Sequence, residues 1–166
     1  MKNVRNMTYS ALMAALLVVC GWIAIPIPPV SFTLQTFGVL TALGVLGGKW
    51  GSISILIYLA LGAVGMPVFA GFRGGLGVLL GVTGGYIWGF LATGLVYWGL
   101  EKLNKPLAMG LGLVACYVCG CLWFSVYAGG AGFVGAVVKC VVPYLIPDLC
   151  KLVLAERLAR RLKVSH

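Results

Sequence analysis

The chain has 166 residues, of which 61% are hydrophobic and only 9% are charged, and its mean hydropathy is +1.07. A soluble domain carries about a quarter charged residues, so the composition excludes an ordinary soluble fold and predicts a single domain, residues 1–166, embedded in a lipid bilayer. The net charge of +9 does not indicate a nucleic-acid partner. The basic residues lie in short patches between apolar runs and form no extended basic face.

Six apolar segments follow one another along the chain, each bounded by Pro, Gly or charge. The first is preceded by Lys2 and Arg5, as a signal peptide would be, but no small-residue cleavage site follows, so we interpret it as a retained span. At these lengths only helices satisfy their backbone in lipid, since a barrel needs alternating polarity. We therefore predict an all-α membrane protein with six transmembrane helices, at about residues 8–25, 33–47, 50–65, 84–100, 107–127 and 134–158.

The basic residues predict the orientation of these helices, because cytoplasmic loops carry an excess of Lys and Arg. With the amino terminus inside, Arg73 is the one basic residue of the outer connections. The inner side then receives Lys2, Arg5, Lys49, Lys102, Lys105, Arg157, Arg160, Arg161 and Lys163. We predict that both termini are cytoplasmic and that the protein is a multi-pass component of the cell (inner or cytoplasmic) membrane.

Two of the outer connections differ in character. The first, residues 26–33, is stiffened by three prolines. The connection at residues 66–83 is apolar and Gly-rich, and a segment of this kind tends to fold over a pocket or to dip into the membrane. This combination of a stiff and an adaptable rim is suited to a ligand gate.

The chain has few residues suited to catalysis, so we predict no enzyme activity and no cofactor. No His lies in any predicted span, which excludes Ser-His hydrolysis there. Glu101 and Glu156 lie at the inner rim, far from the third acidic residue, Asp148. The glycines before Lys49 do not form an ATP-binding loop, because the first glycine of that motif and the Ser or Thr after the Lys are missing.

Six cysteines lie inside the apolar runs. Cys116 and Cys119 have the spacing of a metal or redox motif, but no second ligand pair accompanies them. A structural zinc site usually needs four thiolate or imidazole ligands. We therefore interpret the cysteines as small apolar packing residues and predict no metal.

The last apolar segment contains the strongest candidate for a binding site. Asp148 and Lys151 are three residues apart, which places them on one face of a helix within reach of each other. An ionisable side chain at membrane depth costs roughly 2.5–3.5 kcal/mol on insertion scales, so it usually faces the protein interior and marks a site. The alternative is a charge pair that satisfies only itself and helps helices to pack.

Small residues mark two further places. Free N–H groups in the turn Thr83-Gly84-Gly85-Tyr86, at the start of the fourth predicted helix, could hold an anion or a carbonyl, and Tyr86 adds a ring and a hydroxyl. For Gly85, close packing of helices is the preferred alternative. Ala11 and Ala15 are four residues apart and form a flat stripe where another helix can lie, either within this chain or in a partner.

Several ordered motifs resemble those of the BioY family, whose members are the biotin-binding S components of energy-coupling factor (ECF) transporters. The motifs are Val30-Ser-Phe-Thr-Leu-Gln35-Thr36, Leu46-Gly-Gly-Lys49-Trp50-Gly51, Gly62-Ala-Val-Gly65-Met-Pro67-Val-Phe69-Ala-Gly71, Gly74-Gly75-Leu-Gly-Val-Leu-Leu-Gly81-Val-Thr83-Gly84-Gly85-Tyr86 and Ile146-Pro147-Asp148-Leu-Cys-Lys151. The resemblance implies a six-helix S-component fold with an outward-facing pocket. It also implies that Asp148, Lys151 and the Thr83–Tyr86 turn contact biotin.

The chemistry of biotin fits these residues. Asp148 can accept from the ureido N–H groups and Lys151 can donate to the ureido carbonyl. Four apolar side chains are candidates to surround the rings and the chain of the ligand: Phe69, Phe72, Leu76 and Tyr144. Arg73 is a candidate partner for the carboxylate, with a solvated loop arginine as the equal alternative.

The resemblance further implies that Ala11 and Ala15 dock a transmembrane coupling (T) subunit joined to ATPase subunits. The predicted function is therefore biotin capture from the outer side and delivery inward with an ATP-driven module. Two alternatives stay open. One is a ligand-free structural subunit in which Asp148 and Lys151 clasp helices together, and the other is a biotin transporter that acts alone or as a homo-oligomer.

Overall fold

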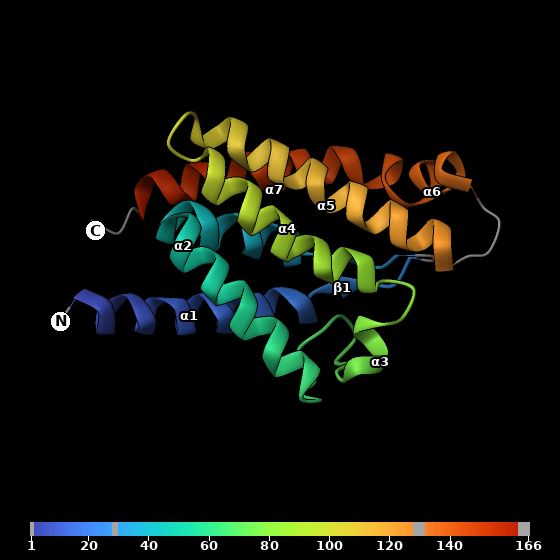
Figure 1. The fold of residues 1–166 in the computed structure, drawn as a ribbon, viewed down its shortest axis with the longest axis horizontal. Coiled ribbons are helices and arrows are strands. Elements are labelled where there is room, and N and C mark those ends of the chain that lie inside the picture. Colours follow the sequence, from blue (N-terminus) through green and yellow to red (C-terminus); the bar gives the residue numbers. More distant parts are fainter. Residues whose placement is uncertain (1, 28–29, 128–131, 163–166) are drawn as a thin grey trace.

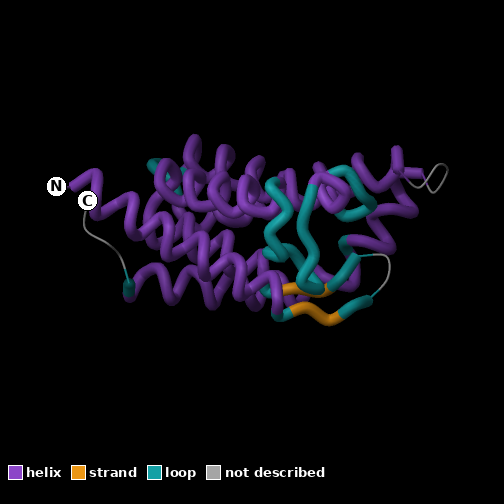
Figure 2. Tube along the Cα trace, turned by 90° about the horizontal axis from the view of Figure 1, so that it is seen from below, coloured by secondary structure: helices purple, strands orange, loops and turns teal. Residues whose placement is uncertain are grey.

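The protein is mostly helical in a computed structural model that describes residues 2–27, 30–127 and 132–162 (Figure 1). In chain order its elements are α1 (Lys2–Trp22), β1 (Ala24–Ile25), β2 (Phe32–Thr33), α2 (Gln35–Ala63), α3 (Leu76–Leu79), α4 (Gly84–Leu100), α5 (Lys105–Tyr127), α6 (Gly132–Cys140) and α7 (Val142–Arg161). α1 begins and α7 ends at the same end of the molecule, which we call the near end (Figure 1). The strands, α3 and α6 lie at the opposite, far end, where Figure 2 shows most loops gathered.

The second and third predicted helices form one element with a reversal inside it. At Gly47 the backbone of α2 leaves the helical region, with φ 78° and ψ 171°. A Cβ placed on Gly51 would lie 2.7 Å from Cα of Leu43, so the limb at residues 48–63 folds back on the limb at residues 35–46. The N–H of Gly48, at the start of the second limb, donates to Oε2 of Glu101 at 2.8 Å. Glu101 thus satisfies a backbone donor that a helix start leaves free.

The sixth predicted helix is divided in two. Val141, with φ −122° and ψ −52°, separates α6 from α7. Proline is tolerated in the first turn of a helix because the N–H that it lacks would have no helical partner there. Pro143 occupies the first turn of α7, and so fits a new start rather than the continuation of one helix.

The first predicted helix also ends earlier than expected. α1 stops at Trp22 because Ala24 and Ile25 pair antiparallel with Thr33 and Phe32 in a two-stranded ribbon. In contrast, α4 has the predicted bounds, 84–100, and α5 begins two residues earlier than predicted.

α4 and α5 pack through glycines. A Cβ on Gly85 would lie 2.2 Å from Cβ of Trp123, and one on Gly89 would lie 2.9 Å from Sγ of Cys116. These contacts require that both positions carry no side chain, as close helix packing predicts.

Within the described residues, three helices are long and apolar enough to cross a membrane: Asn3–Trp22, Gln35–Ala63 and Lys105–Tyr127. Large apolar side chains are exposed along several of the helices, among them Leu12 on α1, Leu95 on α4 and Leu122 on α5. Such an outer surface fits a lipid environment. Together these features describe a multi-pass membrane protein.

Candidate ligand-binding site

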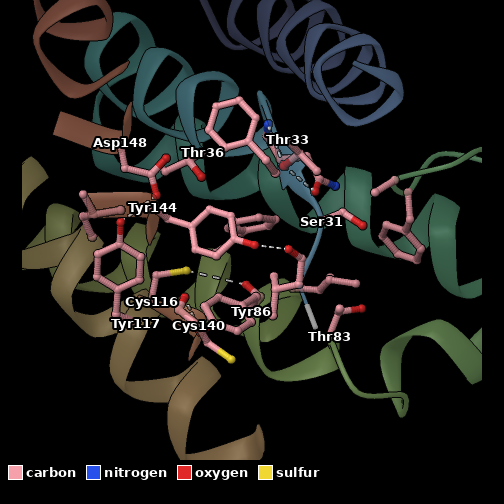
Figure 3. Close-up of a pocket in the computed structure, with 18 of the residues that line it drawn as sticks. Ser31, Thr33, Thr36, Thr83, Tyr86, Cys116, Tyr117, Cys140, Tyr144 and Asp148 are labelled. Carbon is pink, nitrogen blue, oxygen red and sulfur yellow. Dashed lines mark hydrogen bonds between the residues drawn. The ribbon is translucent and has the colours of Figure 1, made fainter. Parts of the chain in front are cut away.

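A cavity of about 70 Å³ lies at the far end. This volume is several times what one ordered water needs. Its wall comes from the β2 region, the start of α2, the connection at residues 66–83, and helices α4, α5, α6 and α7. Figure 3 labels some of the polar residues of this wall: Ser31, Thr33, Thr36, Thr83, Tyr86, Cys116, Tyr117, Cys140, Tyr144 and Asp148. We call this cavity the far-end pocket.

Asp148 and Lys151 form a buried ion pair in the wall of this pocket. Nζ of Lys151 lies 2.6 Å from Oδ1 of Asp148, and the two residues are only 6% and 4% exposed, respectively. Both side chains come from α7, where a spacing of three residues brings them to one face. Charges buried to this extent need hydrogen-bond partners, because transfer out of water is costly for each of them.

The ion pair connects α7 to two other elements. Tyr117 of α5 donates its hydroxyl to Oδ2 of Asp148 at 2.6 Å (Figure 3). Lys151 donates to the carbonyl of Thr33 at 2.7 Å and lies 4.0 Å from the centroid of the Phe32 ring. The carboxylate therefore has charged and neutral donors on its two oxygens, and the ammonium is held over an aromatic face.

Aromatic rings complete the wall around the charges. Tyr144 stacks on Phe32, with ring centroids 6.4 Å apart, and its hydroxyl donates to the carbonyl of Val30. Tyr86 donates its hydroxyl to the carbonyl of Cys140 at 3.1 Å and so links α4 to α6. The result is a pocket with one charged, hydrogen-bonding region in an otherwise apolar and aromatic wall, as is usual for small-molecule sites.

Seven of the residues predicted to contact ligand line the far-end pocket: Phe69, Arg73, Thr83, Tyr86, Tyr144, Asp148 and Lys151. Phe72 and Leu76 are not in the wall that the described residues form. They are 63% and 61% exposed, and the Phe72 ring stacks on Trp22 instead.

Gly84 and Gly85 are also absent from the described wall and face protein instead. A Cβ on Gly84 would lie 2.0 Å from the carbonyl oxygen of Leu79, and Gly85 packs against α5. The N–H groups of Gly84 and Tyr86 donate to the carbonyls of Gly81 and Thr83. This turn therefore offers fewer free donors than the sequence predicts.

Several residues of the pocket were not predicted from the sequence as ligand contacts, among them Tyr117 and Gln35. Tyr117 lies in a continuous apolar run, where the sequence does not distinguish a packing tyrosine from one that donates a hydrogen bond in a site. Gln35 is 5% exposed; its side-chain amide donates to the Tyr58 hydroxyl and accepts from the Thr33 hydroxyl. A buried glutamine at the start of an apolar segment is the signal that could have identified it.

The described residues contain no group of three or more His, Cys, Asp or Glu side chains arranged to hold a metal ion. Cys116 and Cys140 line the far-end pocket, and Cys116 donates its thiol to the carbonyl of Tyr86 at 3.6 Å. Cys20, Cys116, Cys121 and Cys140 are buried, as expected for packing residues, whereas Cys119 is half-buried and Cys150 is exposed.

Fold and site together define a multi-pass membrane protein with a pocket for a small molecule at one end. A family model described as "BioY family" matches residues 1–165. The chain belongs to the BioY family.

Curated relatives and a solved structure agree with this assignment. The chain is 41% identical to "Biotin transporter BioY" of Thermotoga maritima and 42% identical to "Probable biotin transporter BioY" of Pyrococcus horikoshii, with 96% of each chain covered in both cases. These relatives are named as transporters and not as enzymes. The fold matches a crystal structure described as "the S-component for biotin from an ECF-type ABC transporter" with a TM-score of 0.89 and 32% identity, over 97% of this chain and 92% of that chain.

Proposed function

We propose that this protein is a biotin-specific S component, which captures biotin at the outer side of the cell membrane and delivers it inward. The observation that carries the proposal is the buried pair of Asp148 and Lys151, 2.6 Å apart in the wall of the far-end pocket. The names of the relatives and of the matching structure support biotin as the ligand.

The ureido ring of biotin presents two N–H donors and one carbonyl acceptor, and the pair can address both kinds of group. Asp148 accepts from an N–H, and Lys151 donates to the carbonyl. Tyr117 holds the second carboxylate oxygen and so fixes the direction in which Asp148 accepts. The rings of Phe69 and Tyr144 then cover the apolar body of the ligand.

Arg73 is the proposed partner of the biotin carboxylate. It lines the pocket from the 66–83 connection, and its Nε donates to the carbonyl of Ala70 at 3.1 Å. Thr83 and Tyr86 belong to the proposed site through their side chains. Gly84 and Gly85 shape it by allowing α4 to approach its neighbours. Phe72 and Leu76 lie outside the described wall of the pocket.

We further propose six membrane crossings, counting the two limbs of α2 separately and α6 with α7 as one. The far end then faces outward, and both termini are cytoplasmic. Several basic residues of the elements that meet at the near end support this orientation: Arg5, Lys49, Lys102, Lys105, Arg157, Arg160 and Arg161.

Transport through an ATP-driven module requires a docking surface, and α1 is the proposed one. Ala11 and Ala15 are exposed, whereas Ala14 and Leu17 of the same helix are buried in the core. A coupling (T) subunit that is joined to ATPases could lie along this flat face. Support for such partners comes from the matching structure, which is described as part of an ECF-type ABC transporter.

Binding of labelled biotin to the purified chain tests the proposal. Retention of biotin supports capture, and its absence would favour the ligand-free structural subunit. Asp148→Asn or Lys151→Ala with unchanged affinity would remove the site assignment. Uptake measured in vesicles with and without the ATPase partners then separates an S component from a transporter that acts alone or as a homo-oligomer.

A further inference from the structure

The connection at residues 66–83 contains a small hairpin, residues 69–73, which faces the far-end pocket. Phe69 and Arg73 form an isolated antiparallel bridge, and the N–H of Phe69 donates to the carbonyl of Arg73 at 2.9 Å. Phe69, Ala70 and Arg73 line the far-end pocket. The placement of this hairpin therefore decides whether an aromatic ring and a guanidinium face the ligand.

Phe72, in the turn of the hairpin, has an unusual backbone. Its φ of 57° follows a φ of 72° at Gly71, and among the described residues Phe72 is the one non-glycine with a positive φ. A bulky residue rarely adopts this conformation, which persists only where the surroundings impose it. Phe72 is turned away from the pocket, and its ring centroid lies 5.2 Å from that of Trp22, with 26° between the ring planes.

The last turn of α1 contacts this connection at three points. Trp22 stacks on Phe72, and its indole N–H donates to the carbonyl of Pro67 at 2.8 Å. A Cβ on Gly21 would lie 2.8 Å from the carbonyl oxygen of Val68, so α1 lies directly against the backbone there. The same oxygen accepts from the hydroxyl of Tyr58 at 3.2 Å.

We infer that Trp22 and Phe72 form a clasp that holds the 69–73 hairpin over the pocket, which makes Trp22 a positioning residue for the retention of biotin. This inference depends on the proposed function. Trp22 is not in the described wall of the pocket, so its effect passes through the hairpin. Because the hairpin closes one side of the pocket, release of the clasp acts mainly on the rate at which ligand leaves.

The test measures dissociation of labelled biotin from purified protein after addition of excess unlabelled biotin. Phe72→Ala removes the ring stack, and we expect the dissociation rate to rise about three- to tenfold. Trp22→Ala also removes the hydrogen bond to Pro67, so we expect a rise of about ten- to thirtyfold. Trp22→Phe keeps a ring and recovers part of the difference.

Two further variants separate the clasp from other effects. Phe72→Gly relieves the left-handed backbone but lacks the ring, and we expect it to dissociate as fast as Phe72→Ala. The double variant Trp22→Ala/Phe72→Ala changes the rate by less than the product of the single effects, because both remove the same stack. Val19→Ala, at an exposed position one turn earlier on α1, is the matched control and changes the rate by less than about twofold.

Dissociation rates within twofold of wild type for both Phe72→Ala and Trp22→Ala would overturn the clasp and leave biotin capture intact. An equal change in Val19→Ala would overturn it as well, because the effect would then belong to α1 in general. A wild-type chain that retains no biotin would overturn the proposed function, and this inference with it. Phe72 is 63% exposed, so its variants are expected to fold even if Trp22→Ala does not.

Discussion

Replacement of Lys151 by Met is the most informative single change in the pocket. Met has a similar length and no charge, so the variant leaves Asp148, which is 4% exposed, without its nearest cation. Three contacts are lost: the ion pair at 2.6 Å, the bond to the Thr33 carbonyl at 2.7 Å and the contact with the Phe32 ring at 4.0 Å. Removal of one partner of a buried pair costs about 3–5 kcal/mol, because the other charge is left uncompensated.

Asp148→Asn is the milder counterpart. The amide oxygen of Asn can still accept from Lys151, and the contacts of the ammonium with Thr33 and Phe32 persist. We expect this variant to lower the free energy of unfolding by about 1–3 kcal/mol. Thermal unfolding in detergent should therefore rank the proteins as wild type, then Asp148→Asn, then Lys151→Met.

Biotin affinity is the second measurement on the same proteins. A hydrogen bond to a charged group contributes about 1.5–3 kcal/mol, so each variant should raise the Kd about 10- to 150-fold. Lys139→Met on α6 is the matched control, since Lys139 is exposed and outside the described wall, and its Kd should not change. If Lys151→Met loses stability but binds biotin with the wild-type Kd, the Asp148–Lys151 pair only stabilises the fold. The assignment of Lys151 as a ligand contact is then refuted.

Three further predictions concern Tyr117, the α4–α5 contact and the α1 face. Tyr117→Phe removes the donor at 2.6 Å from Asp148, and the same assay should show affinity about three- to tenfold lower; unchanged affinity would mean that Asp148 needs no orientation. Gly85→Ala places a Cβ 2.2 Å from a side-chain carbon of α5 and should destabilise by about 1–3 kcal/mol on thermal unfolding, whereas Gly99→Ala, in open space on the same helix, should not. Ala11→Leu with Ala15→Leu should abolish ATP-driven uptake but not biotin binding; normal uptake would exclude this face as the docking surface.

The sequence predicts those helix bounds that are determined by neighbouring residues in the chain. The bounds of α4 depend on glycines and charge in the immediate sequence, and they agree with the prediction. The reversal at Gly47 also lies where the sequence shows a break. The division at Val141 lies two residues before Pro143, so its signal is local, but the hydropathy pattern runs on through it. The pairing of Ala24 with Thr33 depends on a contact between two segments, which hydropathy does not reveal.

In the candidate site, too, the sequence predicts what depends on local spacing and misses what depends on the folded connection. A spacing of three residues on one helix was enough to bring Asp148 and Lys151 together. In the 66–83 connection the sequence could not tell which apolar side chains point inward, and Phe69 faces the pocket whereas Phe72 stacks on Trp22. The direction of Phe72 depends on a positive φ in the turn, which no residue type at that position signals.

The charge balance of the pocket also predicts which end of biotin enters first. Asp148 and Lys151 neutralise each other, so a neutral urea adds no net charge beside them, whereas a carboxylate there would meet Asp148 at close range. We therefore expect the carboxylate to lie at Arg73 in the 69–73 hairpin. Iminobiotin, which carries a cationic guanidinium in place of the urea, should bind far more weakly because it faces Lys151. Biotin amide, which is altered at the other end, should lose only the contribution of Arg73. Biotin amide and biotin should therefore bind to the Arg73→Gln variant with equal affinity. Equal loss for both analogues in a competition assay would contradict this orientation.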